Sequence, residues 1–240
     1  MQLEGSVALV SGASRGLGLE VARAFAARGA RLVIAARGAE ALEVAAEELG
    51  RQTDVVALAV DVSEDAEFLV EAGLRRFGRI DVLVNNASEL GPSPMPALED
   101  YSWQDLQRVL RVNVLAPLHL AQLVLPGMKE RGEGVIINVS SDAGVEAYPG
   151  WGGYGASKAA LEHLSRTLAV DLEGTGVRLY VVDPGDMNTE MHRLAEPGVD
   201  LSGLPGPEVA APAFVWLVEH ATASFARFKA QEQATAGVRV

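Results

Sequence analysis

The sequence predicts an α/β fold: a single Rossmann-type, doubly wound parallel sheet with helices on both faces. Three observations lead to this prediction. Short aliphatic runs recur at wide intervals, helical patterns lie between them, and no hairpin turn joins one run to the next. Strands that are buried on both faces form continuous apolar runs, and alternating strands and helices imply right-handed crossovers between parallel strands. We expect one domain, residues 1–240.

Six apolar runs supply the expected strands. They are short and rich in β-branched residues, as is typical of fully buried strands. The runs are residues 6–10, 31–36, 55–60, 80–85, 135–139 and 178–182. Between them, apolar residues such as Leu17, Val21 and Phe25 recur four positions apart, which places them on one face of a helix.

The composition argues against several classes of function. The chain has 240 residues, 49% of them hydrophobic, enough for one large core. A formal net charge of −12 argues against a nucleic-acid partner, which would require clustered Lys and Arg. The chain has no cysteine and its four histidines form no ligand pair, so we expect no disulfide and no metal site. No apolar run reaches the ~20 residues of a membrane span, so we expect no membrane partner and a cytoplasmic location.

Two segments look irregular and follow expected strands. Residues 88–99 carry three prolines, and residues 184–207 carry four prolines and four glycines. Long loops in a compact domain are usually functional or disordered, and ligands of such sheets bind at the carboxyl ends of the strands. We expect both segments to overhang that edge, with a substrate lid around residues 186–206. The alternative is that both are mobile surface loops.

A glycine-rich turn joins the first expected strand to the first helix. The stretch VSGASRGLG places Gly12, Gly16 and Gly18 there. Glycines let the backbone approach a phosphate closely, and the helix N-terminus offers free N–H groups and the positive end of its dipole. Any tight turn could use glycines, but this position after the first strand favours a dinucleotide.

This turn resembles that of the short-chain dehydrogenase/reductase family, in its compact branch, where it usually reads TGxxxGxG. Ser11 stands where threonine is usual and keeps a hydroxyl. Motifs in family order extend the resemblance over roughly residues 5–230. The residues of the turn that the resemblance implies for cofactor binding are Ser11, Gly12, Ser14, Arg15, Gly16, Leu17 and Gly18.

The resemblance continues at the ends of later strands. Asp61 and Val62, after the third strand, resemble the family's adenine-contacting pair. Residues 85–87 resemble its NNAG signature, with Ser88 in place of the glycine, and residues 183–191 resemble its PGxxxT motif. The cofactor-binding residues implied there are Asp61, Val62, Asn86, Ala87, Pro184, Gly185, Met187 and Thr189. Asn85 also has a structural reading, because asparagines at strand ends often tie neighbouring backbone groups together. The usual Asp-Gly-Gly ending is missing; we expect a last strand near Phe225–Ala230 and a short tail around 231–240.

The end of the second strand bears on the choice of cofactor. Folds that prefer NAD usually place Asp or Glu there to bind the ribose 2′-OH, whereas this chain has Ala36 followed by Arg37. Together with Arg15, Arg37 could pair with a 2′-phosphate. We therefore expect NADP(H) to be favoured over NAD(H). Each arginine could also be an ordinary solvated surface residue.

Tyr154 and Lys158 lie four residues apart in YGASK, on one face of a helix. A phenol has a pKa near 10, so acid–base work near neutrality requires a lower pKa, and a nearby cation would favour the phenolate. The pair alone is typical of a helix surface. The resemblance makes both residues catalytic, with Lys158 lowering the tyrosine pKa and holding the cofactor ribose, so both also count as cofactor-binding residues.

Ser141 and Asn113 complete the expected catalytic group. The family's serine usually precedes the tyrosine by about thirteen residues, which selects Ser141 over Ser140, and alternation along a strand should turn the two hydroxyls opposite ways. By resemblance Ser141 polarises the substrate carbonyl and Asn113 holds a water that extends a proton relay. Pro117 frees the Asn113 carbonyl of its helical partner, leaving a place for a water, although it could merely bend the helix.

The expected activity is hydride transfer between NADP(H) and a carbonyl or secondary alcohol, with Tyr154 as general acid/base. The alternatives are an NAD(H)-dependent alcohol dehydrogenase of the same family and a non-catalytic NADPH-binding sensor. A methyltransferase would share the glycine turn but would give Tyr154 and Lys158 no role. We expect a neutral, moderately hydrophobic substrate. Candidate pocket walls are Asp142, Glu146, Tyr148, Trp151, Met187, Met191 and His192. We also expect a homodimer or homotetramer, paired through long helices at about 101–129 and 154–172.

Overall fold

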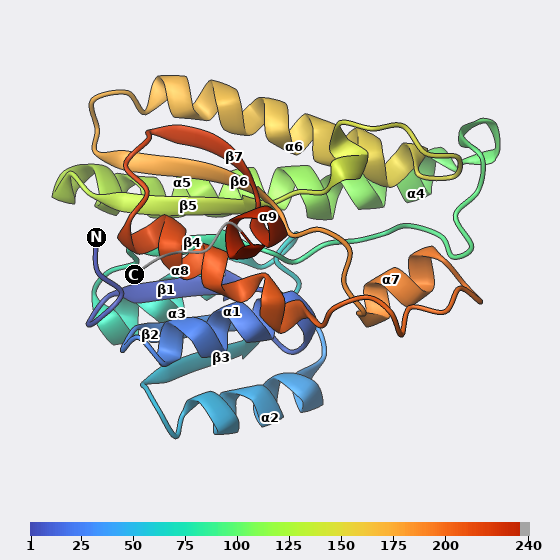
Figure 1. Cartoon of the computed structure of the whole chain (residues 1–240). Helices are drawn as coiled ribbons and strands as arrows, with labels where there is room; N and C mark the ends of the chain where they lie inside the picture. The colour runs from blue at the N-terminus through green and yellow to red at the C-terminus, as the bar shows by residue number, and fades with distance from the viewer. Residues whose placement is uncertain (236–240) are drawn as a thin grey trace.

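The computed structural model describes residues 1–235 and contains one parallel sheet (Figure 1). Its strands are β1 (Val7–Ser11), β2 (Arg31–Ala36), β3 (Val55–Ala59), β4 (Val82–Asn85), β5 (Gly134–Val139), β6 (Val177–Asp183) and β7 (Phe225–Lys229). They lie in the order β3-β2-β1-β4-β5-β6-β7. The strand order reverses between β1 and β4, as in doubly wound dinucleotide folds, so the predicted fold class is confirmed.

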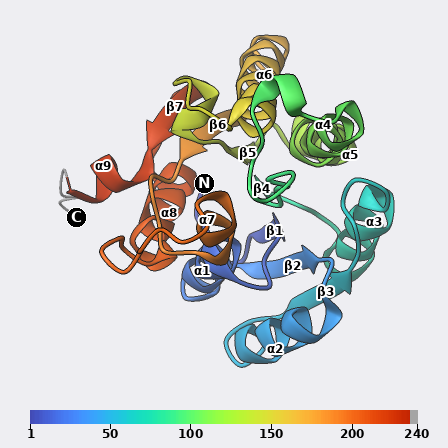
Figure 2. The same ribbon diagram turned by 90° about the vertical axis from the view of Figure 1, so that its right-hand side faces the viewer.

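Helices cover both faces of the sheet (Figure 2). The helices are α1 (Gly16–Ala26), α2 (Ala39–Leu49), α3 (Ala66–Phe77), α4 (Trp103–Leu110), α5 (Ala116–Arg131), α6 (Gly152–Asp171), α7 (Glu190–Ala195), α8 (Ala211–Glu219) and α9 (Ala230–Thr235). Apolar residues of α1, α2 and α8 pack on one face, and those of α3, α5 and α6 pack on the other. In β1, Ala8 and Val10 point into the first core, whereas Val7 and Leu9 point into the second. Double coverage explains why β1, β4 and β5 read as continuous apolar runs. The expectation of a fully buried strand is wrong for β3, which lies at the edge of the sheet and is only partly buried.

The long helix expected at about 101–129 is interrupted. A π-helical turn, Arg111–Leu115, separates α4 from α5. The proline at position 117 lies just beyond this turn, near the start of α5, where a missing N–H is tolerated. The helix therefore widens at the turn that contains Asn113, and Asn113 is buried.

The helical stretch Trp103–Arg131 is long and apolar enough, by length and composition, to cross a membrane. In its most apolar window, 56% of the residues are buried inside the molecule, as in a core helix, so the resemblance to a span is weak evidence. Together with α6, this stretch contains the helices expected to pair in an oligomer. The pairing itself stays a prediction.

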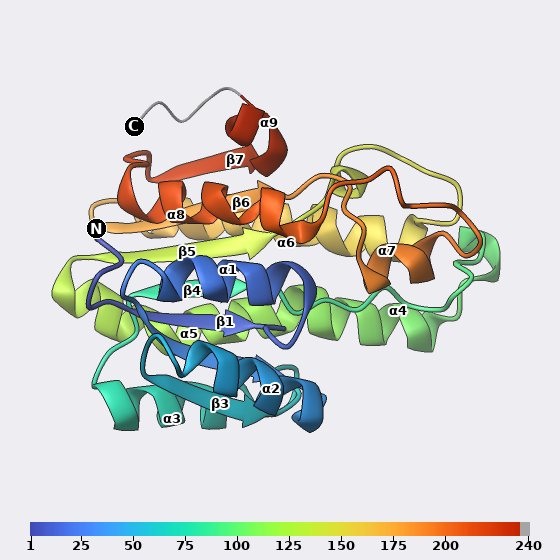
Figure 3. The same ribbon diagram turned by 60° about the horizontal axis from the view of Figure 1, so that its bottom comes forward.

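Both long loops lie beyond the carboxyl ends of the strands (Figure 3). The segment expected to be an irregular lid, residues 186–206, contains the short helix α7. The hydroxyl of Ser93 donates to the carbonyl of Leu194 at 2.7 Å and joins the two loops. The predicted tail is helical at its start, where the side chain of Gln231 donates to the carbonyl of Asp186 at 2.8 Å. Residues 236–240 of that tail lie outside the described residues.

Candidate active site

The glycine turn leaves room for a phosphate group in front of α1. Gly16 has a φ of +58°, and a Cβ built there meets nothing within 4 Å. A Cβ at Gly18 would overlap the carbonyl of Gly12, so helix and turn can approach only without a side chain. No side chain caps α1 at Arg15, so its first N–H groups are available to a ligand, with Ser14 half-buried and Leu17 buried beside them. This cradle fits the pyrophosphate of a dinucleotide.

Ser11 and Asn86 hold the glycine turn against the end of β4. The Ser11 hydroxyl accepts hydrogen bonds from the backbone N–H groups of Asn86 and Ala87, each at 3.0 Å. The Asn86 side chain donates to the carbonyls of Ser11 and Gly12, each at 3.0 Å. The polar groups of these predicted cofactor-binding residues therefore shape the cradle by binding each other.

Carboxylates engage both predicted NADP-selecting arginines. Arg37 pairs with Glu89 at 3.3 Å, and Arg15 pairs with Glu190 at the start of α7. Both guanidinium side chains are about two-thirds exposed. The two carboxylates offset positive charge where a 2′-phosphate is expected. The sequence interpretation missed them because Glu89 and Glu190 lie in the two long segments after β4 and β6, whose paths it could not place.

The remaining predicted cofactor residues also lie at the carboxyl edge of the sheet. Asp61 follows β3 and accepts hydrogen bonds from the N–H and the hydroxyl of Ser63 at 2.9 and 2.7 Å, and Val62 is buried beside it. Pro184 and Gly185 follow β6, and Met187 is buried in the apolar core. The Thr189 hydroxyl accepts from the N–H of His192 at 3.3 Å and caps α7.

Tyr154 and Lys158 share the first turns of α6 and are both buried. The Lys158 ammonium lies 5.3 Å from the centre of the Tyr154 ring and donates to the carbonyl of Val139 at 2.9 Å. Tyr154 packs in an apolar cluster with Leu90 and Ala195, which come from the two long loops. The helix thus presents both polar groups to a site that the loops cover.

Burial shifts the pKa of both residues. It lowers the pKa of Lys158 from 10.5 to about 8. Burial also raises the pKa of Tyr154 far above its usual value, which a hydrogen bond with the Ser88 side chain offsets only in part. The net pKa of the phenol therefore lies above its usual value rather than below it, because burial is the largest effect. A lowering contribution from Lys158 stays a prediction. The apolar surroundings of the phenol outweigh the neighbouring ammonium, which is itself bound to a carbonyl.

The two serines after β5 have different partners. The Ser140 hydroxyl donates to the buried carboxylate of Glu162 at 2.7 Å. The Ser141 hydroxyl donates to Asp142 at 2.9 Å and accepts from the N–H of Ala143 at 3.1 Å. Ser141 must therefore exchange its carboxylate acceptor for a substrate oxygen before it can polarise a carbonyl.

Asn113 binds the loop after β4 with its whole amide. Its oxygen accepts from the hydroxyl of Ser88 and the N–H of Glu89 at 3.1 and 2.7 Å. Its nitrogen donates to the Glu89 carbonyl and the Ser157 hydroxyl at 2.8 and 2.9 Å. Ser88 thus connects Tyr154 to Asn113, a link that the sequence interpretation missed. The signal was present, because Ser88 departs from the glycine of the family motif.

The predicted pocket walls gather partly around Tyr154. Trp151 stands edge-on to Tyr154 at 5.9 Å and to Tyr148 at 6.2 Å, and Met191 packs on the same apolar cluster. The Tyr148 hydroxyl donates to Asp142 at 2.8 Å. Burial raises the pKa of Asp142. The hydrogen bonds from Tyr148, Ser141 and Ala143 together outweigh burial and bring that pKa below its usual value. An ionised carboxylate therefore stands beside Ser141.

The other predicted wall residues do not belong to the apolar cluster around Tyr154. Met187 belongs to the core beneath the sheet edge, and His192 pairs with Glu196 at 3.4 Å within the same segment. Glu146 is exposed in the loop before α6. The structure therefore brings the aromatic walls and Met191 to the phenol and joins Asp142 to Ser141.

Known proteins with similar sequences are oxidoreductases. The family model described as short chain dehydrogenase matches residues 6–199. An uncharacterized oxidoreductase of Thermotoga maritima is 39% identical over 194 residues, covering 79% of this chain and 75% of the relative. The 2-(R)-hydroxypropyl-CoM dehydrogenase of Xanthobacter autotrophicus is 37% identical over 218 residues, covering 87% of each chain.

Solved structures agree with these relatives. A 3-ketoacyl-(acyl-carrier-protein) reductase from Brucella melitensis, complexed with NADH, superposes with a TM-score of 0.86 at 30% identity, covering 95% of this chain and 97% of that one. A metagenomic short-chain oxidoreductase in complex with NADP has a TM-score of 0.79 at 29% identity, covering 94% and 97%. With the glycine turn and the Tyr154–Lys158 pair in one parallel sheet, the chain belongs to the short-chain dehydrogenase/reductase family of oxidoreductases.

Proposed function

We propose that this oxidoreductase is an NADP(H)-dependent carbonyl reductase, formally reversible with a secondary alcohol. The observation that carries the proposal is the position of Tyr154, Lys158 and Ser141 at the sheet edge that also holds the glycine cradle. The nicotinamide cofactor, when bound, supplies the hydride that reduces the carbonyl carbon. The chain supplies the proton and the orientation.

Each side chain has a definite part in this reaction. Tyr154, whose phenol is protonated at neutral pH, donates its proton to the substrate oxygen as charge develops on that oxygen. Ser141 turns from Asp142 to donate to the same oxygen and fixes its position. Lys158 supplies positive charge beneath the tyrosine ring, which stabilises a developing phenolate.

The surroundings of Tyr154 favour a neutral, moderately apolar substrate. Its neighbours Leu90, Ala195 and Trp151 are apolar or aromatic. The ionised Asp142 beside Ser141 would repel a carboxylate on the substrate. An aryl or branched alkyl ketone matches both properties.

A panel of aldehydes and ketones, assayed by NADPH oxidation, tests this activity. We expect turnover with neutral aryl ketones, and kcat/KM lower by about tenfold or more for the matched ketone that carries a carboxylate near the carbonyl. The Asp142→Asn variant should narrow that difference. Tight NADPH binding without turnover on any member would favour the non-catalytic sensor instead.

The cofactor preference rests on opposing charges. Arg15, Arg37 and the absence of an acid at Ala36 support NADP(H). The carboxylate of Glu89, held 3.3 Å from Arg37, supports the alternative of NAD(H). Known relatives do not decide between them, since one solved structure carries NADP and another carries NADH.

Replacing Glu89 with glutamine is therefore expected to increase the preference for NADPH. Loss of the ion pair, in which Arg37 is exposed and Glu89 is mostly buried, releases Arg37, so the ratio of kcat/KM for NADPH to that for NADH should rise about two- to fivefold. Arg37→Asp should move the ratio the opposite way. Glu71→Gln, which removes a more exposed pair with Arg75 on α3, is the control and should leave the ratio unchanged. If neither Glu89→Gln nor Arg37→Asp changes the ratio, the role given to Arg37 is contradicted.

A further inference from the structure

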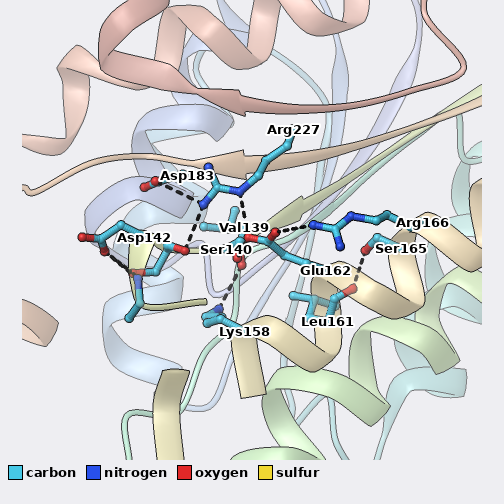
Figure 4. Close-up of polar contacts among 12 residues, drawn as sticks. Val139, Ser140, Asp142, Lys158, Leu161, Glu162, Ser165, Arg166, Asp183 and Arg227 are labelled. Carbon is cyan, nitrogen blue, oxygen red and sulfur yellow. Dashed lines mark hydrogen bonds and ion pairs between the residues drawn. The ribbon is translucent and has the colours of Figure 1, made fainter. Parts of the chain in front are cut away.

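Arg227 lies between Glu162 and Asp183, on the same side of the sheet edge as Asp142 and Lys158 in the view of Figure 4. It lies on β7, the strand at the edge of the sheet. Its side chain reaches between the carboxylates of Glu162 on α6 and Asp183 at the end of β6. Both carboxylate side chains are almost fully buried, at 3% and 6% exposed, whereas that of Arg227 is 22% exposed.

Arg227 makes hydrogen bonds to groups on two sides of the proposed reaction site, next to Ser141 and before the turn after β6. Its Nε donates to Glu162 Oε1 at 3.0 Å, and its Nη2 donates to the carbonyl of Ser141 at 3.2 Å. The same Nη2 lies 3.4 Å from Asp183 Oδ2. One guanidinium therefore reaches the backbone of the carbonyl-orienting serine and the carboxylate that precedes the Pro184–Gly185 turn.

Each carboxylate passes this restraint on. Glu162 lies one helical turn after Lys158 and accepts the hydroxyl of Ser140, so it holds the residue next to Ser141. Asp183 accepts the backbone N–H of Gly185 at 3.0 Å through its other oxygen. Arg227 thus ties the end of β5, the first half of α6 and the turn after β6 to one another.

The chemistry of this group calls for an arginine. Buried carboxylates need a charged or hydrogen-bonding partner, and removing that partner leaves a costly unpaired charge. A planar guanidinium offers several donors in fixed directions, so it can serve two carboxylates and a carbonyl together, which a lysine ammonium does less well. Arg166 also pairs with Glu162, at 3.3 Å, but it lies on the same helix, and none of its recorded contacts reaches Ser141 or Asp183.

We propose that Arg227 is a positioning residue that sets the orientation of Ser141 and of the Pro184–Gly185 turn relative to each other. In this way it controls the alignment of the substrate carbonyl with the cofactor. Small displacements of a reacting group can cost about a hundredfold in rate, so such control has a large kinetic effect. The inference rests on the proposed reductase function.

The test compares Arg227→Met with Arg166→Met. We expect Arg227→Met to lower kcat by about tenfold to a hundredfold, with the Kd for NADPH, measured by fluorescence titration, within about threefold of the wild-type value. Arg166→Met removes an arginine from the same carboxylate and should keep both quantities near wild type. A kcat in Arg227→Met that matches Arg166→Met would overturn the proposal.

Two further variants separate positioning from simple loss of folding. Arg227→Met combined with Glu162→Gln removes one of the two buried carboxylates that Arg227→Met alone leaves without the guanidinium, so the melting temperature should recover while kcat stays low. Arg227→Lys should recover part of kcat. If activity returned in step with the melting temperature in the double variant, Arg227 would be structural only and the proposal would fail.

A readout without turnover keeps this inference apart from the reductase assignment. Amide hydrogen exchange at residues 140–144 and 185–187 should be faster in Arg227→Met than in Arg166→Met, whether or not any carbonyl is reduced. Wild-type protein that reduces no carbonyl would reject the proposed function. Unchanged exchange in both segments would reject the role of Arg227.

Discussion

Replacing Tyr154 with phenylalanine is expected to lower kcat by about 10²- to 10⁴-fold, the usual contribution of a general acid. The phenol hydroxyl is the only group lost, and the ring keeps its place in the apolar cluster with Leu90 and Ala195. The Kd for NADPH should therefore change little. Stopped-flow measurement of hydride transfer at saturating ketone, together with nucleotide titration, measures both quantities.

Tyr180→Phe is the matched control. Tyr180 is fully buried, and its hydroxyl donates to the carbonyl of Ala223 at 2.9 Å, in the core beside β7. Its loss should cost about 1 kcal/mol of unfolding free energy without a comparable loss of rate. Equal turnover in Tyr154→Phe and wild type would remove Tyr154 as the acid.

Replacing Lys158 with methionine is expected to abolish most turnover and yet stabilise the cofactor-free protein. The ammonium is fully buried with one recorded hydrogen-bond acceptor, the carbonyl of Val139. Its pKa falls from 10.5 to about 8 because burial disfavours the charge. At pH 7 the folded chain carries that charge at a cost, so methionine should add about 1–3 kcal/mol of unfolding free energy.

The same shift predicts a dependence of stability on pH. Between about pH 8 and pH 10.5 the unfolded lysine binds a proton that the folded lysine has released, so the wild type gains stability as the pH rises. The gain of Lys158→Met over wild type should therefore shrink across this range in urea unfolding experiments. Lys129→Met, at an exposed position on α5, should show no such trend. A less stable Lys158→Met at pH 7 would contradict the cost assigned to the buried charge.

Local pattern was sufficient to predict the strands and the glycine cradle. Runs such as residues 32–36 are apolar at every position because both faces of the sheet are covered, and this run forms most of β2. The need for glycine at position 18 could also be expected, because close approach of turn and helix is a property of the local chain. The pair Tyr154 and Lys158 could be placed on one helix face from spacing alone.

Contacts between distant segments could not be predicted in this way. Arg37 with Glu89 and Arg227 with Glu162 join residues far apart in the chain, and their meeting depends on loop paths and on strand order. The direction in which the pKa of Tyr154 shifts could not be predicted for a related reason. Spacing places an ammonium near the phenol, but only the fold shows that apolar residues from two loops bury it.

The place of β7 also orders events during synthesis of the chain. The strands that carry the glycine cradle, β1 to β4, precede it by more than a hundred residues, so they leave the ribosome well before Arg227 does. The sheet order lets β7 join only at one free edge, beside β6. A nascent chain can therefore assemble its nucleotide cradle well before Ser141 and the turn after β6 are tied together. We expect stalled or truncated chains that end before residue 225 to resemble a nucleotide-binding module without an aligned reaction centre.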